Sequence, residues 1–312
     1  MKVFLATIFL ATVALPSSAA AQQTSRLDTE RPFRALLIVA HPDDEYDMAA
    51  TVYRIAQELA GWVDQIVISD GEGGYRYSLL ANRYYGVDLT DESTGRSNLP
   101  KIREAEARGA ARILGIRRQW FLKERDDHFT LSADEALKSW RTDRVLAELV
   151  ESLREGHYDV VFVSLPTAET HNQHKAASLL ALKAVEQLPV RERPAVVGAE
   201  ADPKDTASYK ALSAYPSTAV ISSSPQFHFD RDTRFGFQNA LSYEIVVDWV
   251  IAEHKSQGLF QTKCGQDRFE NFWVFALSAD SSLSRTKALF ERIAAPTSRG
   301  KQTAAAVSGN AQ

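Results

Sequence analysis

Short apolar segments alternate with longer segments of helical periodicity along much of the chain. The short segments are rich in β-branched residues and predict strands over residues 35–40, 63–69, 119–122, 159–164 and 195–199. Apolar residues recur at spacings of three and four between them, which predicts helices over residues 46–60, 101–114, 137–155 and 175–188. This alternation predicts an α/β, Rossmann-like fold with a mostly parallel sheet and helices on both faces.

Three segments interrupt the alternation. Residues 75–100 lack a helical period and hold several tyrosines among polar residues, which predicts a long loop able to stack on a ligand or, alternatively, a packed surface insertion. Residues 200–216 are polar and loop-like, and residues 226–237 mix aromatic and charged side chains before another helix that ends near Ala252. No internal repeat or second domain is evident. We therefore expect one domain with long loop insertions over residues 30–290.

The two ends of the chain have compositions of their own. Lys2 precedes an apolar run over residues 3–15, and small residues with an A-x-A pattern follow it, which predicts a signal peptide over residues 1–21. The run is too short to span a bilayer. We therefore expect an exported protein, either periplasmic or secreted. Residues 296–312 are rich in Ser, Ala, Gly and Gln and predict a disordered tail.

Charge and cysteine content narrow the possible partners. The formal net charge is -4 and no long basic run occurs, so nucleic acid is not an expected partner. Cys264 is the only cysteine, which excludes a disulfide within the chain. We expect no membrane span after signal cleavage, because no later segment is apolar for long enough. The oligomeric state cannot be derived from these patterns.

The first predicted strand ends at an unusual group of polar residues, in the stretch "LLIVAHPDDE" that contains His41, Asp43, Asp44 and Glu45. A carboxylate here can simply cap the following helix. A cap does not explain the histidine or the second carboxylate, whereas a divalent cation explains both. Zinc accepts imidazole nitrogen and carboxylate oxygen, and catalytic zinc sites use three protein ligands.

A pair of histidines lies at the end of another predicted strand. His171 and His174 follow residues 159–164 and stand at the start of a predicted helix, where residues three apart can face one cavity. Ligands in parallel α/β sheets bind at the carboxyl ends of the strands. Together with His41, the pair places three of the seven histidines at strand ends, which predicts a shared metal site.

Several motifs together resemble one known family. They are "AHPDDE" (residues 40–45), "SDGEGG" (69–74), "IREAEARGAARILGI" (102–116), "HNQH" (171–174) and, more weakly, "AEHKSQ" (252–257). In this order they resemble the PIG-L/LmbE-like zinc-dependent N-deacetylases, and the resemblance runs from about residue 34 to 188. It implies one zinc ion per chain and removal of an acetyl group from an N-acetylglucosamine unit, often within a glycoside.

The resemblance also implies a role for each motif residue. His41, Asp44 and His174 would ligate the zinc, and Asp43 would be the general base. His171 would stabilise the oxyanion or protonate the leaving amine. These roles agree with the chemistry of the residues, since two imidazoles and one carboxylate leave the ion a net positive charge and a good Lewis acid. Glu45 is expected to interact with the helix dipole or to lie behind the ligands.

The resemblance and the tyrosine-rich segment also suggest substrate contacts. Arg103 matches a family arginine that lies near the substrate, and Tyr75 and Tyr77 are our candidates for stacking on a sugar. The second motif departs from the family's common His-Pro-Asp-His, because Asn172 and Gln173 stand between the histidines. This change puts the orientation of the first histidine, and with it the acyl or sugar preference, in question.

The sequence leaves three functions to compare. The first is an exported zinc-dependent hydrolase that deacetylates an N-acetylglucosamine-type amino sugar. The second is a metal-dependent amide or ester hydrolase acting on a non-sugar metabolite, and the third is a non-catalytic carbohydrate-binding protein. The presence of Asp43 argues against the third, because a binding protein needs no base. The chain has no G-x-S-x-G nucleophile motif, and Arg76 breaks a possible dinucleotide fingerprint.

Overall fold

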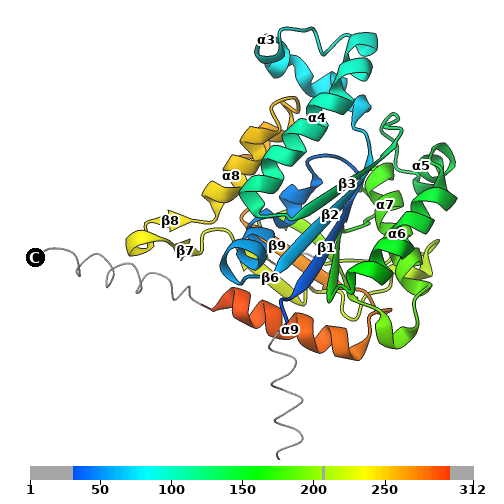
Figure 1. Ribbon diagram of the computed structural model, residues 1–312, viewed down its shortest axis with the longest axis vertical. Helices are drawn as coiled ribbons and strands as arrows, with labels where there is room; N and C mark the ends of the chain where they lie inside the picture. Colours follow the sequence, from blue (N-terminus) through cyan, green and yellow to red (C-terminus); the bar gives the residue numbers. More distant parts are fainter. Residues whose placement is uncertain (1–30, 206–207, 296–312) are drawn as a thin grey trace, which may run out of the picture. The chain divides into compact units, whose positions relative to one another are not determined.

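Parallel strands make up most of the central sheet in this computed structural model, which describes residues 31–205 and 208–295. The sheet has the strand order β3-β2-β1-β4-β5-β9-β6 (Figure 1). Its strands are β1 (Arg34–Val39), β2 (Trp62–Ser69), β3 (Arg118–Glu124), β4 (Val160–Ser164), β5 (Ala195–Asp202), β6 (Phe227–Asp230) and β9 (Phe269–Val274). Strands β1 to β5 pair in parallel, and β9 runs antiparallel to both of its neighbours. The predicted mostly parallel α/β fold is confirmed.

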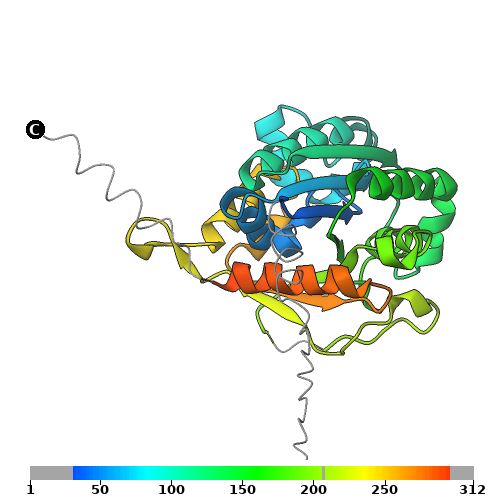
Figure 2. The same ribbon diagram turned by 60° about the horizontal axis from the view of Figure 1, so that its bottom comes forward.

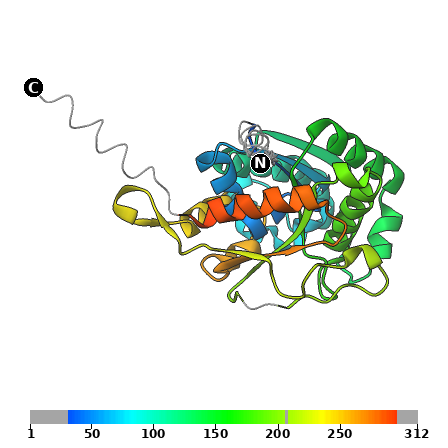
Figure 3. The ribbon, with the colours of Figure 1, turned by 90° about the horizontal axis from the view of Figure 1, so that it is seen from below.

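Helices cover both faces of this sheet (Figures 1 and 2). One face carries α2 (Ala49–Tyr53), α4 (Glu92–Leu114), α8 (Glu244–Glu253) and α9 (Asp280–Ala294), and the other carries α5 (Ala133–Ser139), α6 (Thr142–Gly156) and α7 (Asn172–Glu186). Helix α9 crosses in front of the strands in Figure 3 and contacts β5 and β6. A separate small ribbon pairs β7 (Arg234–Phe235) with β8 (Leu241–Ser242).

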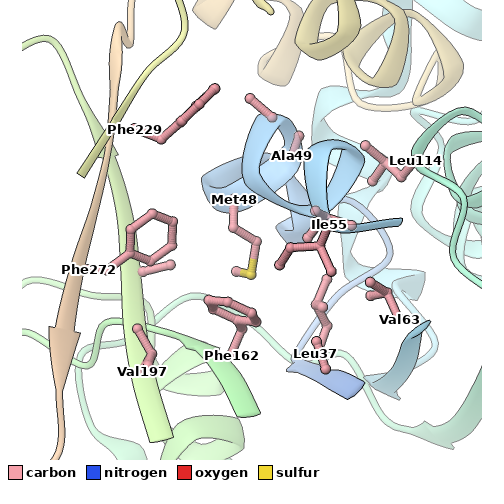
Figure 4. Close-up of a cluster of buried hydrophobic side chains, with 14 of the residues drawn as sticks. Leu37, Met48, Ala49, Ile55, Val63, Leu114, Phe162, Val197, Phe229 and Phe272 are labelled. Atoms are coloured by element: carbon pink, nitrogen blue, oxygen red, sulfur yellow. The ribbon is translucent and has the colours of Figure 1, made fainter. Parts of the chain in front are cut away.

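Alternate residues of each strand pack into the two hydrophobic cores, as the pleat of a strand requires. Leu37 of β1 and Phe162 of β4 point to one face, where they lie with Met48 and other buried side chains (Figure 4). Leu36 and Ile38 point to the other face and pack against α5, α6 and α7. Both faces of β1 are therefore buried.

Most of the segment 75–100 is helical and part of it is buried, so the predicted long loop was wrong and the alternative, a packed insertion, agrees with the structure. It contains most of a 3-10 segment, η3 (Glu72–Ala81), then α3 (Asn82–Tyr85), and α4 begins well before its predicted start. The side chain of Asp91 caps α4. Leu99 packs with Tyr75 in a small buried cluster, and this burial outweighs the poor helix propensity of Pro100.

Other elements also differ from prediction. The predicted helix 137–155 is two helices, because the backbone of Trp140 is extended and its buried indole donates a hydrogen bond to the carbonyl oxygen of Arg125 at 2.9 Å. The initial helix is composite, with η1 (Asp44–Met48) before α2 and a π-helical turn η2 (Arg54–Glu58) after it. Strand β9 and helix α9 were not predicted at all.

The order of the strands brings the two histidine motifs together. β1 and β4 are neighbours, with Ile38 opposite Val163, so their carboxyl ends meet at the same edge of the sheet. The chain continues from β1 to β2 on one side, while β4 lies on the other side. This is the switch point of the sheet, where α/β proteins bind ligands.

The predicted signal peptide (1–21) and disordered tail (296–312) lie outside the described residues and stay predictions. The predicted domain boundaries at residues 30 and 290 also stay predictions. The described residues from Phe33 to Ala295 belong to a single compact unit. Among the described residues, no helix has the length and apolar character needed to cross a membrane.

Candidate metal centre

The loops that follow β1 and β4 line a cavity of about 340 Å³. Its lining includes three exposed side chains that are apolar or aromatic, Tyr77, Phe129 and Leu259. We call these three residues the rim. Every candidate site residue predicted from the sequence lines this one cavity: His41, Asp43, Asp44, Tyr75, Tyr77, Arg103, His171 and His174. Their individual roles stay predictions.

Three potential ligand atoms converge on the cavity. Nε2 of His174 lies 3.0 Å from Nδ1 of His41 and 3.1 Å from Oδ1 of Asp44, and the last two atoms are 3.6 Å apart. Atoms bonded to a tetrahedral zinc ion at about 2.0–2.1 Å stand roughly 3.3 Å from one another. The spacing and the chemistry of this set therefore fit a small divalent cation.

The local backbone orients Asp44. Its Oδ2 atom accepts hydrogen bonds from the backbone N–H groups of Ala40 and His41, both at 2.9 Å, and its Oδ1 atom is left to face the imidazoles. Burial raises the pKa of Asp44, yet the imidazoles of His174 and His41 hold it well below its usual value. The carboxylate is thus charged and aimed at the point where the ligand atoms converge.

The cavity floor favours a positive charge. Burial lowers the pKa of His41, but the carboxylates of Asp126 and Asp44 outweigh burial and raise this pKa to about 10. A proton and a metal ion therefore compete for the same position on His41. A pocket that binds a proton this strongly through nearby carboxylates also attracts a divalent cation.

The second nitrogen of His41 has partners of its own. Nε2 lies 3.0 Å from Oε1 of Gln173 and 3.5 Å from Oδ1 of Asp126, and both partners are buried. Metal-binding histidines commonly donate their other ring N–H to an oxygen in this way, which fixes the tautomer. From the sequence, Gln173 was considered only for its effect on the orientation of His171, whereas in the structure its side chain contacts His41.

His171 is the third imidazole of the cluster. Its ring centroid lies 5.3 Å from that of His41 and 5.4 Å from that of His174, and the three histidines could also form a metal site by themselves. Burial and the positive charges of His41 and His174 lower the pKa of His171 to about 3. A neutral His171 is therefore expected near pH 7, which favours the first of the two roles considered from the sequence, stabilisation of the oxyanion.

Asp43 lines the same cavity and pairs with an arginine. Its Oδ1 atom lies 3.0 Å from Nη2 of Arg103, in an ion pair that is largely buried. Burial raises the pKa of Asp43, and the guanidinium of Arg103 opposes this shift without cancelling it. A carboxylate with a raised pKa beside a metal pocket is suited to accept and return a proton.

Arg103 also ties together the loops around the cavity. Its Nη1 atom donates to the carbonyl oxygen of Gly71 at 3.0 Å, and Nη2 donates to that of Pro42 at 3.3 Å. Gly71 has a φ of +74°, and a Cβ atom there would lie 2.8 Å from the Arg103 side chain. The glycine in the second motif thus allows both the left-handed turn and the close approach of the arginine.

The two candidate tyrosines differ in their exposure. Tyr75 is only 7% exposed and belongs to the buried cluster with Leu99, so it offers little surface for a ligand. Tyr77 is 44% exposed and stands on the rim with Phe129 and Leu259. Of the two, Tyr77 is the better candidate for stacking.

Sequence reasoning missed Asp126 and Gln257, which also line the cavity. Asp126 is buried after the end of β3, and its Oδ2 atom accepts a hydrogen bond from the backbone N–H of Gly73 at 3.1 Å. Its position after a third parallel strand was the available signal. Gln257 ends the "AEHKSQ" motif and fits closely against Gly74, where a Cβ atom would lie 2.6 Å from its Oε1 atom.

Glu45 lies behind the ligands and away from the cavity. Its Oε1 atom is 2.6 Å from Nε2 of His254, and its Oε2 atom accepts a hydrogen bond from Gln65 at 3.2 Å. All three side chains are buried. His254 belongs to the last motif, so this pair joins α8 to the segment that carries the metal ligands.

Comparisons with known proteins give one family match and several similar solved structures. Residues 36–185 match the family model PIG-L, described as GlcNAc-PI de-N-acetylase. Similar solved structures include an N,N'-diacetylchitobiose deacetylase from Pyrococcus horikoshii, with 19% identity over 85% of this chain and 95% of that one and a TM-score of 0.49. A deacetylase from the biosynthesis pathway of teicoplanin has 18% identity over 79% and 99% of the two chains and a TM-score of 0.45.

A protein named for different chemistry is similar to a comparable degree. GalB, the 4-carboxy-2-hydroxymuconate hydratase from Pseudomonas putida KT2440, has 14% identity over 78% of this chain and 95% of that one, with a TM-score of 0.46. No curated protein matches the chain. At these identities and TM-scores, none of the three structures decides the substrate or the reaction.

Proposed function

Because residues 36–185 match the PIG-L family model, we propose that this chain is a metal-dependent hydrolase that removes the N-acetyl group from an N-acetylglucosamine-type amino sugar. One observation carries the proposal: three ligand atoms converge at 3.0 to 3.6 Å on a cavity that is also lined by a half-buried carboxylate, Asp43, which is not one of them. A purely structural cluster has no use for that fourth group.

His41, Asp44 and His174 are the residues that would hold the ion, with zinc as the expected metal. When bound there, a divalent cation supplies Lewis acidity to the amide that is to be cleaved. The protein's own contribution is a cavity whose ligands are oriented in advance, because Asp44 is fixed by two backbone N–H groups.

Asp43 acts as the general base in this proposal. It accepts a proton from the attacking water, and its raised pKa places it closer to the pH at which such a transfer is efficient. Arg103 holds the carboxylate through the 3.0 Å ion pair, so the base keeps one orientation. The protonated Asp43 then returns the proton to the amine nitrogen that leaves.

His171 stabilises the oxyanion as a neutral N–H donor. Its pKa of about 3 keeps the imidazole uncharged before the reaction, and a neutral imidazole still donates one hydrogen bond. Donors placed where negative charge develops are worth about 2.7–4 kcal/mol each in acyl-transfer enzymes. Phe129 packs against His171 with 5.1 Å between ring centroids and shields one side of it.

The rim is where we place the rest of the amino sugar. Tyr77 and Phe129 offer ring faces of the kind on which the C–H groups of a sugar stack. Leu259 and Phe129 are 56% and 59% exposed, and they favour equally an apolar acyl amide or ester. A non-sugar substrate is therefore the second candidate function. We also propose export of the enzyme, for which the N-terminal sequence pattern is the support.

The direct test is release of free amine from N-acetylglucosamine glycosides, chitooligosaccharides and simple N-acyl amides. The purified chain is compared with its chelator-treated form, before and after zinc is restored, and with Asp43→Asn as the matched inactive control. We expect zinc-dependent release from the sugars and none from the control. Release only from non-sugar amides would select the second function, and zinc binding without hydrolysis of any substrate would contradict both.

A further inference from the structure

Gln173 is a partner of the metal-ligand cluster with an uncharged side chain. It stands on the first turn of α7, directly before His174, yet its Oε1 atom lies 3.0 Å from Nε2 of His41 in a different loop. The side chain is fully buried. The two loops that supply the ligands are therefore joined by this hydrogen bond.

The neighbouring carboxylate determines which way the hydrogen bond runs. Oδ1 of Asp126 lies 3.5 Å from the same nitrogen of His41, and an ionised carboxylate can only accept. Nε2 must therefore carry a hydrogen atom, and Gln173 must present its oxygen to it. The lone pair of the neutral imidazole is then on Nδ1, which faces Asp44 and His174.

The cost of keeping an amide at this position argues for a specific use. The Nε2 atom of Gln173 makes no hydrogen bond with any described residue, although it is buried. A buried donor without a partner is unfavourable, and an apolar side chain would fill the same space without that cost. The oxygen of Gln173, directed at His41, is the feature that an apolar residue could not supply.

We propose that Gln173 is a positioning residue that fixes the tautomer of His41. Because its side chain is neutral, the metal centre carries one negative charge fewer than it would with a carboxylate at this position. The inference rests on the proposed metal site. Asp126 already supplies one carboxylate beside His41, so a second one would make the imidazole more basic and the bound ion a weaker Lewis acid. A neutral amide orients the ligand without that effect.

Zinc affinity tests the proposal without relying on turnover. Competition with a chromophoric chelator is measured for the wild type, Gln173→Leu, Gln173→Glu and the control Gln187→Leu, an exposed glutamine at the other end of α7. We expect Gln173→Leu to bind zinc about 10–100-fold more weakly. Gln173→Glu should bind at least as tightly as the wild type, and the control should not differ.

A second readout separates positioning from a general loss of structure. The visible spectrum of the cobalt-substituted protein reports the ligand geometry, and it should change in Gln173→Leu and be preserved in Gln173→Glu. If Gln173→Leu does not fold, Gln173→Glu alone tests the inference, because weaker zinc binding by that variant would overturn it. Equal affinities of Gln173→Leu and the wild type would overturn it as well. A wild-type chain that binds no zinc would instead overturn the proposed function.

Discussion

The adjacent carboxylates Asp44 and Glu45 each pair with an imidazole, and the two pairs differ in what surrounds them. His254 and Glu45 are 2.6 Å apart, both are almost completely buried, and each carboxylate oxygen has one donor. His41 and Asp44 belong to a cluster that opens into a cavity, where His174 brings a third ligand atom within 3.1 Å of Asp44. The first pair is closed, and the second is open to an additional ion.

The comparison shows that residue type alone does not identify a metal site. Glu45 directly follows Asp44 in the sequence, and His254 is as good a potential ligand as His41. Only the convergence of several acceptor atoms on one accessible point distinguishes the site. Changes in the open cluster should therefore affect metal binding and catalysis, and changes in the closed pair should affect stability.

The largest expected effect follows from removing a ligand of the open cluster. His174→Ala should lose bound zinc and lower amine release by about 10³-fold or more, because several kcal/mol of Lewis-acid stabilisation are lost. Metal content by mass spectrometry and the amine assay check this outcome. The control is His228→Ala, an exposed histidine on β6. Full zinc content in His174→Ala would be incompatible with the assigned ligand set.

Removing the base should separate catalysis from metal binding. Asp43→Asn should lower kcat by about 10²–10⁴-fold, the usual contribution of a general base, with zinc still bound at one ion per chain. Steady-state kinetics and metal content are measured on the same preparation. Loss of the zinc together with the activity would mean that Asp43 is itself a ligand.

The closed pair should respond in the opposite way. His254→Ala leaves the buried Glu45 without its cation, and we expect a loss of about 3–5 kcal/mol in the free energy of unfolding. Zinc stoichiometry should be retained at temperatures where the variant is folded. Urea denaturation of the zinc-free proteins measures the effect, and a stability equal to that of the wild type would argue against a charged pair.

The stability difference between the wild type and the same variant should depend on pH. Burial lowers the pKa of His254, but Glu45 outweighs burial and raises it above the ordinary value of 6.5. A raised pKa in the folded state contributes stability that is complete below the unfolded pKa and is lost as the pH rises through the folded pKa. The difference in stability between wild type and His254→Ala should thus be larger near about pH 6 than near about pH 9. The opposite trend would contradict the direction of this shift.

The smallest effect is expected at the rim. Tyr77→Ala should raise KM for sugar substrates by about 2–10-fold with little change in kcat, as expected for one lost stacking contact. Tyr84→Ala is the matched control, because Tyr84 is 68% exposed in the same insertion but does not line the cavity. Equal effects of the two substitutions would remove Tyr77 from the substrate site.

The sequence predicted the five parallel strands and the two ligand-bearing loops because both depend on local patterns. Buried parallel strands are continuous apolar runs, and each ligand motif follows one of them. The insertion after β2 was mispredicted, because its helices depend on tertiary burial of Leu99 against Tyr75 rather than on local propensity.

The side-chain contacts behind the ligands could not be predicted from the sequence for a similar reason. Gln173 and His41 are 132 positions apart, and His254 and Glu45 are 209 apart. A single sequence has no local signal for such pairs. Asp126 could have been predicted as a site residue, since it follows the end of a strand as His41 and His171 do.

The most direct test of the account is the zinc content and amine release of His171→Ala. The structure permits two ligand sets that share His41 and His174, one completed by Asp44 and the other by His171. We predict that the variant keeps one zinc ion per chain and loses about 10²–10³-fold in kcat, as expected for a missing oxyanion donor. Loss of the zinc would assign His171 as a ligand, and full activity would remove it from catalysis. Either result would contradict the mechanism proposed for this site.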